Sequence, residues 1–121
     1  MTLLVNLLDK DIEYQQVAVI SREEALKSKA ETVKRFIRAY VEGIRFYKSH
    51  KDVAVKKTMA LLKTSDREIA EYDYGQRVRA LPDDGRPTVK GLQLALDDIA
   101  KDNPKARNLT VQQLMDLSFV P

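Results

Sequence analysis

The clearest pattern of hydrophobic and polar positions lies between Ala30 and Ser49. Hydrophobic residues recur there every three or four positions, over about five helical turns. They are Val33, Phe36, Ile37, Tyr40, Val41, Ile44 and Tyr47. Charged residues fill most positions between them, so the spacing predicts an amphipathic helix over residues 30–49. Gly43 interrupts this helix at a cost of about 1 kcal/mol relative to Ala, which favours close packing of Gly43 against another element.

Weaker helical patterns lie on both sides of this helix. A short helix is expected up to about Lys27, opened by a capping box between Ser21 and Glu24. Further helices are expected at residues 52–62, 66–80, 88–102 and 110–117, with a loop at 81–87. Thr88 is the expected cap of the fifth helix, and Thr110 opens a second capping box at the last one.

The only good strand candidate spans residues 13–20 (EYQQVAVI). Its second half is a run of β-branched and small apolar residues, which is typical of a strand buried on both faces. Such a strand needs neighbours, and residues 3–8 supply one at most. One or two short strands followed by five or six helices is an unusual layout for a complete domain. We therefore expect a mostly α-helical single partial domain over residues 1–121, forming the last portion of an α/β protein.

Composition narrows the function classes. The 121 residues suffice for one small domain, and 44% hydrophobic with 32% charged residues is a globular balance. The absence of Cys excludes a disulfide scaffold and a thiolate zinc site, and the single His, His50, excludes a His-rich metal site. The apolar first eight residues lack a basic region before them and fail as a signal peptide. No apolar stretch approaches the ~20 residues that span a bilayer.

Several segments occur in an order and spacing that resembles one known family. They are residues 7–14 (LLDKDIEY), 21–23 (SRE), 32–44 (TVKRFIRAYVEGI), 87–93 (PTVKGLQ), 103–106 (NPKA) and 117–119 (LSF). Together they resemble the C-terminal third of the substrate-binding proteins of ABC importers for nitrate, sulfonates and taurine (the NitT/TauT, or SsuA-like, group). Each motif is structural, and the weight lies in their order along nearly the whole chain.

The resemblance implies a parent α/β fold of the periplasmic-binding-protein type (type II), with two lobes and a solute cleft between them. Residues 13–20 would form the strand where the chain crosses back from the second lobe to the first, and the following helices would pack on the first lobe. The implied partners are the remainder of the binding protein, an ABC permease and a small-molecule solute. The parent family works in the periplasm or outside the cytoplasm. Most of the cleft lies outside this chain, so little or no solute binding is expected from it alone.

Tyr14, Gln15 and Gln16 are the candidate ligand-binding residues. Polar side chains at the start of a buried strand can make the few hydrogen bonds that a solute cleft or hinge requires. The alternative is ordinary polarity at a strand edge facing water, which is the commoner situation. Family members often carry Gly or another small residue here, and this chain departs from that pattern. No catalytic residue, metal ligand or cofactor site is expected.

The alternative functions are a fragment of an enzyme and a small helical module that binds another protein or nucleic acid. The same fold group includes the pyrimidine-precursor synthase of thiamine biosynthesis, which needs a reactive His and metal-handling residues. His50 is instead explained by its place at the end of a helix, where a cation complements the helix dipole. The adjacent carboxylates at 83–84 and 97–98 lack a third group at useful spacing for catalysis or Mg²⁺ binding.

A basic face on the helix at 30–49 is the only feature that favours nucleic acid. It carries Arg35, Arg38, Arg45 and Lys48. Glu31 and Glu42 interrupt the positive field, and the aromatic rings fall mainly on the apolar stripe, so we expect no nucleic-acid partner. Exposed apolar surface is expected on the helices, which makes a homo-oligomer plausible.

Overall fold

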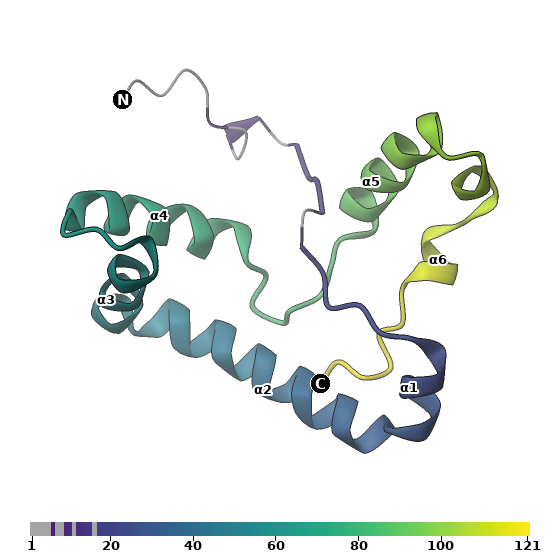
Figure 1. Ribbon diagram of the computed structural model, residues 1–121, viewed down its shortest axis with the longest axis horizontal. Helices are drawn as coiled ribbons and strands as arrows, with labels where there is room; N and C mark the ends of the chain where they lie inside the picture. The colour runs from purple at the N-terminus through teal and green to yellow at the C-terminus, as the bar shows by residue number, and fades with distance from the viewer. Residues whose placement is uncertain (1–5, 7–8, 11, 16) are drawn as a thin grey trace.

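The computed structural model describes residues 6, 9–10, 12–15 and 17–121. Within them the chain is mostly helical (Figure 1). The helices are α1 (Glu23–Ser28), α2 (Ala30–Ser49), α3 (Lys51–Leu62), α4 (Arg67–Ala80), α5 (Val89–Asp102), the 3₁₀ helix η2 (Pro104–Asn108) and α6 (Val111–Leu114). The mostly α-helical character expected from the sequence is confirmed.

Side-chain caps fix the start of the helices α4, α5 and α6. The carboxylate of Asp66 accepts hydrogen bonds from the first turn of α4, and Thr88 Oγ1 accepts from Gly91 N at the start of α5. Thr110 and Gln113 form the predicted capping box of α6. The capping box predicted at Ser21 is wrong, because α1 begins after Arg22 and Ser21 lies one position too early to reach the helix amides. The last helix ends at Leu114 and is three residues shorter than predicted.

The predicted strand at residues 13–20 is also wrong. Residues 12–15 and 17–20 have no regular secondary structure, and no strand occurs in the part of the chain that the structure describes. Position 16 lies outside that part. Val17 is 75% exposed and Ile20 is 90% exposed. A strand exists only when another strand pairs with its backbone, and the described residues offer this segment no such neighbour.

The helices form two groups that share little core (Figure 1). In the first group, α1 packs on α2, α2 on α3, and α3 on α4. Its buried side chains are Val41, Ile44, Ala54, Val55, Thr58 and Ala70. In the second group, α5 packs on η2 and α6 around Leu96, Ala106 and Val111. Each group buries only its own few apolar side chains, so each core is small.

Polar contacts tie the first group together. Tyr74 Oη donates a hydrogen bond to the carbonyl oxygen of Lys48 (2.7 Å), and its ring packs against Tyr47 with centroids 5.3 Å apart. Arg67 pairs with Asp52 of α3 and Glu71 of α4, at 2.7 Å each. These contacts hold α4 antiparallel to the end of α2 and fix the helical hairpin of α3 and α4.

The segment before position 16 touches both groups. Asn6 Nδ2 donates to Gln76 Oε1 of α4 (2.8 Å), and Asp9 pairs with Arg79 of the same helix. The backbone N–H of Gln15 donates to the carbonyl oxygen of Gly91 in α5 (3.3 Å). This segment therefore bridges the two helical groups.

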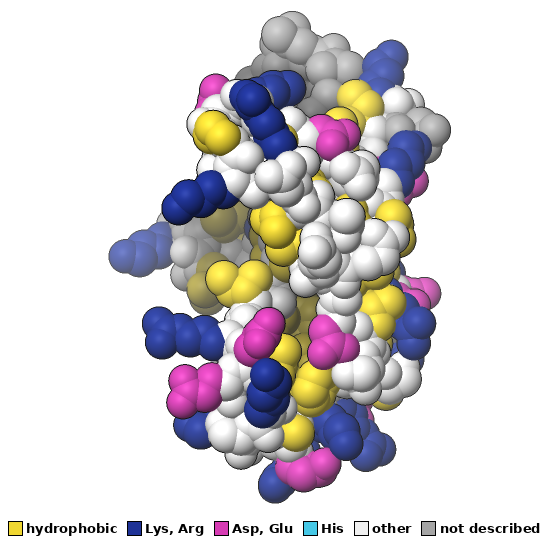
Figure 2. Space-filling model, turned by 90° about the vertical axis from the view of Figure 1, so that its right-hand side faces the viewer, with side chains coloured by type: hydrophobic (Ala, Val, Ile, Leu, Met, Phe, Trp, Pro, Cys, Tyr) yellow, Lys and Arg dark blue, Asp and Glu magenta, His cyan; other side chains and the backbone are white. Residues whose placement is uncertain are grey.

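The molecule exposes far more surface than a compact protein of its size. Its accessible surface is 9699 Å², whereas a compact 13.8 kDa monomer exposes about 6,600 Å². Hydrophobic side chains lie open between charged ones on the side formed by α1, α5 and α6 (Figure 2). The close packing predicted at Gly43 is wrong within the described residues, since a Cβ there would meet nothing within 4 Å. The helices present apolar faces that this chain does not cover.

Candidate functional site

A shallow groove lies between residues 12–13 and the face of α5 that carries Lys90, Leu94 and Asp97, which we call its outer face. It has a volume of about 720 Å³ and is open to solvent along its length. Its lining residues are Ile12, Glu13, Val89, Lys90, Gln93, Leu94 and Asp97. We call this feature the α5 groove. Its lining combines apolar side chains with the charged Glu13, Lys90 and Asp97.

Gly91 allows the two walls of the groove to approach. A Cβ at this position would lie 2.8 Å from Thr88 Oγ1 and 3.4 Å from the backbone nitrogen of Gln15. The absence of a side chain lets Thr88 cap the helix while Gln15 reaches the Gly91 carbonyl. The groove thus depends on one glycine at the third position of α5.

Two of the three predicted ligand-binding residues lie beside this groove without lining it. The Tyr14 side chain is about half exposed, and Gln15 is half-buried. The Gln15 side-chain amide donates to the carbonyl oxygen of Val17, so its polar group serves a local turn. Gln16 lies outside the described residues. The structure brings Tyr14 and Gln15 to the start of α5 but does not converge their polar groups on a shared cavity.

The groove residues that matter were not predicted. Lys90 and Asp97 lie two helical turns apart on α5. From the sequence, Asp97 was considered only as half of an adjacent carboxylate pair, and Lys90 only as part of the 87–93 segment. The available clue was the 87–93 segment, where a cap residue is followed three positions later by a glycine. That spacing indicates a close approach to the helix start, but it does not say which segment approaches.

The charged side chains of the groove form exposed ion pairs and hydrogen bonds within the chain. Lys90 Nζ lies 3.7 Å from Glu13 Oε1, and both side chains are well exposed. Gln93 Nε2 donates to Asp97 Oδ1 (2.8 Å). Next to the groove, the Asp98 carboxylate accepts from Lys101 Nζ (2.8 Å) and raises the pKa of that ammonium group. Each of these charged groups therefore has a partner within the chain.

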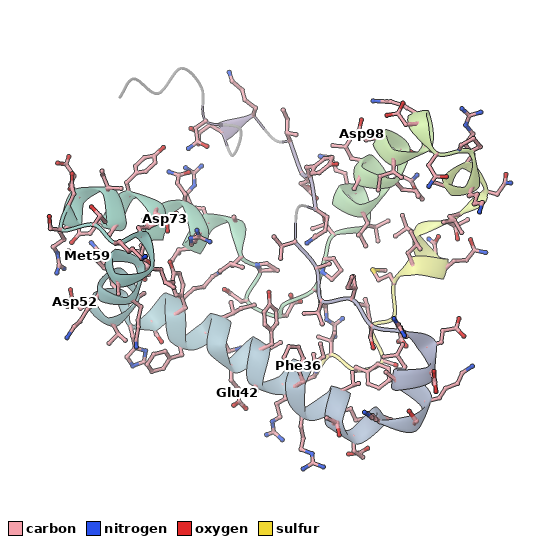
Figure 3. All side chains as sticks on the ribbon, in the orientation of Figure 1. Phe36, Glu42, Asp52, Met59, Asp73 and Asp98 are labelled. Atoms are coloured by element: carbon pink, nitrogen blue, oxygen red, sulfur yellow. The ribbon has the colours of Figure 1, made fainter. Side chains whose placement is uncertain are left out.

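Acidic residues are dispersed over the molecule. Asp52 and Asp73 lie at the α3 and α4 end, far from Asp98 on α5 (Figure 3). Among the described residues, no group of three or more His, Cys, Asp or Glu side chains could hold a metal ion. Asp83 pairs with Lys48, and that ammonium group lowers the pKa of the Asp83 carboxyl.

The basic face of α2 is interleaved with acids. Lys34 pairs with Glu31 (3.1 Å), and Arg38 pairs with Glu42 (3.3 Å). His50 lies at the junction of α2 and α3, where its ring stacks on Phe46 and its Nδ1 lies 3.0 Å from the Phe46 carbonyl oxygen. The helix-end position expected for His50 is confirmed.

Within the described part of the chain, no helix is both long enough and apolar enough to cross a membrane. Comparison with family models, with curated proteins and with solved structures gave no match to this chain.

Proposed function

We propose that this chain is the C-terminal part of a solute-binding protein of an ABC importer, of the nitrate, sulfonate and taurine group. In this role it supplies structural elements of one lobe and binds little or no solute alone. The order of the family-like segments supports the proposal, and three of these segments fall on or beside defined helices. Residues 32–44 lie within α2, residues 87–93 form the capped start of α5, and residues 117–119 follow α6.

The exposed state of residues 17–20 is the observation that carries the proposal. Val17 and Ile20 are the kind of β-branched residues that central strands bury, yet they are 75% and 90% exposed. The chain here is irregular and lacks a strand partner among the described residues. In the parent fold the same segment would be the crossover strand and would pair with the sheet of the lobe.

The surface area supports the same role. The chain exposes roughly 3,000 Å² more than a compact protein of its mass. Permanent interfaces commonly bury 2,000–5,000 Å² in total, about half of it on each side. The uncovered surface is therefore large enough for a lobe that packs permanently against these helices.

Reconstitution with the missing portion tests the proposal. The chain would be mixed with a separately produced N-terminal portion of a taurine- or sulfonate-binding protein that ends before the crossover strand. We expect a 1:1 complex by size-exclusion chromatography with light scattering, and taurine or sulfonate binding by calorimetry only in that complex. Solute binding by the chain alone, or the failure of any such portion to form a complex, would refute the proposal.

A matched pair of variants locates the contact. Ile20→Lys should abolish the complex, because it places a charge in the paired strand. Leu61→Lys changes a residue of similar exposure at the end of α3, 83% exposed, and should leave the complex intact. Intact-mass measurement of the same samples tests the enzyme alternative, which would show a bound metal or a covalent pyridoxal-type adduct.

A further inference from the structure

The outer face of α5 is apolar at its centre, with Lys90 and its ion-pair partner Glu13 at one end and Asp97 at the other. Leu94 lies near the middle, with 42% of its surface exposed, and Val89 and Ile12 extend the apolar floor at one end. Lys90 and Asp97 line the same groove, seven residues apart on the helix. Seven residues are about two turns, or roughly 10 Å along the axis, so both groups lie on one face.

The positions of Lys90 and Asp97 match those of Asp97 and Lys90 on an antiparallel second copy of the helix. If a second α5 is laid antiparallel across the first, a two-fold axis between residues 93 and 94 brings Lys90 opposite Asp97 of the second copy. The same axis brings Asp97 opposite Lys90 of the second copy, and Leu94 meets the Gln93–Leu94 region at the centre. A single surface thus satisfies both halves of a two-fold interface, in which each contact occurs twice.

We propose that two copies of this chain pair through the α5 groove as a two-fold dimer with antiparallel α5 helices. A standard stable interface covers about 800 Å² on each partner. A single helix with residues 12–13 beside it lies at the small end of the range, so the dimer is a weak one with micromolar dissociation.

The dimer is independent of the proposed importer role. It uses the outer face of α5, whereas the importer role depends on residues 17–20 pairing with a missing lobe. Either can fail in experiments without the other. The Ile20→Lys variant should leave the dimer intact, which separates the two surfaces directly.

Sedimentation velocity of the full chain across the micromolar range is the first test. We expect a reversible monomer–dimer equilibrium that weakens as salt is added, because exposed ion pairs are screened. A chain that stays monomeric throughout that range would overturn the proposal and leave the groove to a different occupant.

Charge reversal then tests the geometry. Lys90→Glu places Glu opposite Asp97 of the second copy, and Asp97→Lys places Lys opposite Lys90. Each variant alone should weaken dimerisation at least about tenfold, since two contacts per dimer become repulsive. Mixing the two variants should restore wild-type affinity, because both contacts in the mixed dimer again join opposite charges.

Recovery of dimerisation in the mixture would exclude a local structural defect as the cause of the weaker dimers. Lys90→Glu also breaks the pair with Glu13 inside its own chain, but that defect persists in the mixture and cannot explain restored pairing. Lys27→Glu, which breaks an exposed ion pair with Glu23 on α1, is the matched control and should dimerise as wild type. A dimer that both groove variants form at full strength, or a mixture that fails to recover, would overturn the proposed interface.

Discussion

Glycine can be replaced by alanine at three helical positions that have different surroundings. A Cβ at Gly43 of α2 or at Gly75 of α4 would meet nothing within 4 Å. Alanine is favoured over glycine in a helix by about 1 kcal/mol. Gly43→Ala and Gly75→Ala should therefore each raise the free energy of unfolding by about that amount. For a protein of this size, the melting temperature should rise by roughly 4 °C.

Gly91 should respond differently to the same substitution. The new Cβ would lie 2.8 Å from Thr88 Oγ1, which is too close, and 3.4 Å from the Gln15 nitrogen. Thr88 would have to rotate and release its hydrogen bond to the Gly91 amide. Loss of such a cap costs about 1 kcal/mol, and displacement of Gln15 adds to it. Gly91→Ala should therefore leave the free energy of unfolding unchanged or lower it. The value for this variant should lie at least about 1 kcal/mol below that of Gly43→Ala.

Urea unfolding followed by far-ultraviolet circular dichroism measures these differences at constant temperature. A double-mutant cycle sharpens the result. Once Thr88→Ala has removed the oxygen atom, Gly91→Ala should recover most of the helix gain. The reasoning is refuted if Gly91→Ala stabilises the wild type as much as Gly43→Ala does. A destabilising Gly43→Ala would contradict the open surroundings of that glycine.

Three other predictions concern packing, capping and charge. Val55→Ala should lower the free energy of unfolding by about 2 kcal/mol, because Val55 is fully buried, whereas Leu61→Ala at an exposed site should change it by less than about 0.5 kcal/mol. Thr110→Ala removes half of a capping box and should speed amide hydrogen exchange in α6 without changing α2. Lys48 lowers the pKa of Asp83 in the folded state, so this contact stabilises the fold above the ordinary Asp pKa of about 3.9 and is lost as pH falls through the lower folded value. Wild type should therefore melt above Asp83→Asn at neutral pH and converge with it in acid; an acid-independent difference would argue against the ion pair.

The sequence-based expectations were accurate where they depended on residues that lie close together in the chain. The bounds of α2 matched the prediction at both ends, because contrast between its apolar and charged faces extends over the whole helix. The caps at Thr88 and Thr110 were predictable for the same reason, since each joins residues three positions apart. The capping box at Ser21 failed because a shift of one residue in the helix start moved the hydroxyl out of reach.

Expectations that depended on a distant partner were less successful. Residues 13–20 have the composition of a strand, but composition cannot supply the neighbour that makes a strand form. Gly43 indicated close packing in the sequence, and the described structure places nothing against it. The carbonyl oxygen of Gly91, in contrast, accepts a hydrogen bond from Gln15, which lies 76 positions earlier in the chain. The α5 groove could not be predicted because it arises from that long-range contact.

The irregular segment at residues 17–20 has a consequence for the lifetime of the protein in a cell. Proteases and chaperones commonly bind irregular chain whose apolar side chains are accessible, and this segment has both features. A partner that paired with the segment would hide it from them. The amount of chain that survives would then follow the amount of partner, so that degradation keeps the two in proportion.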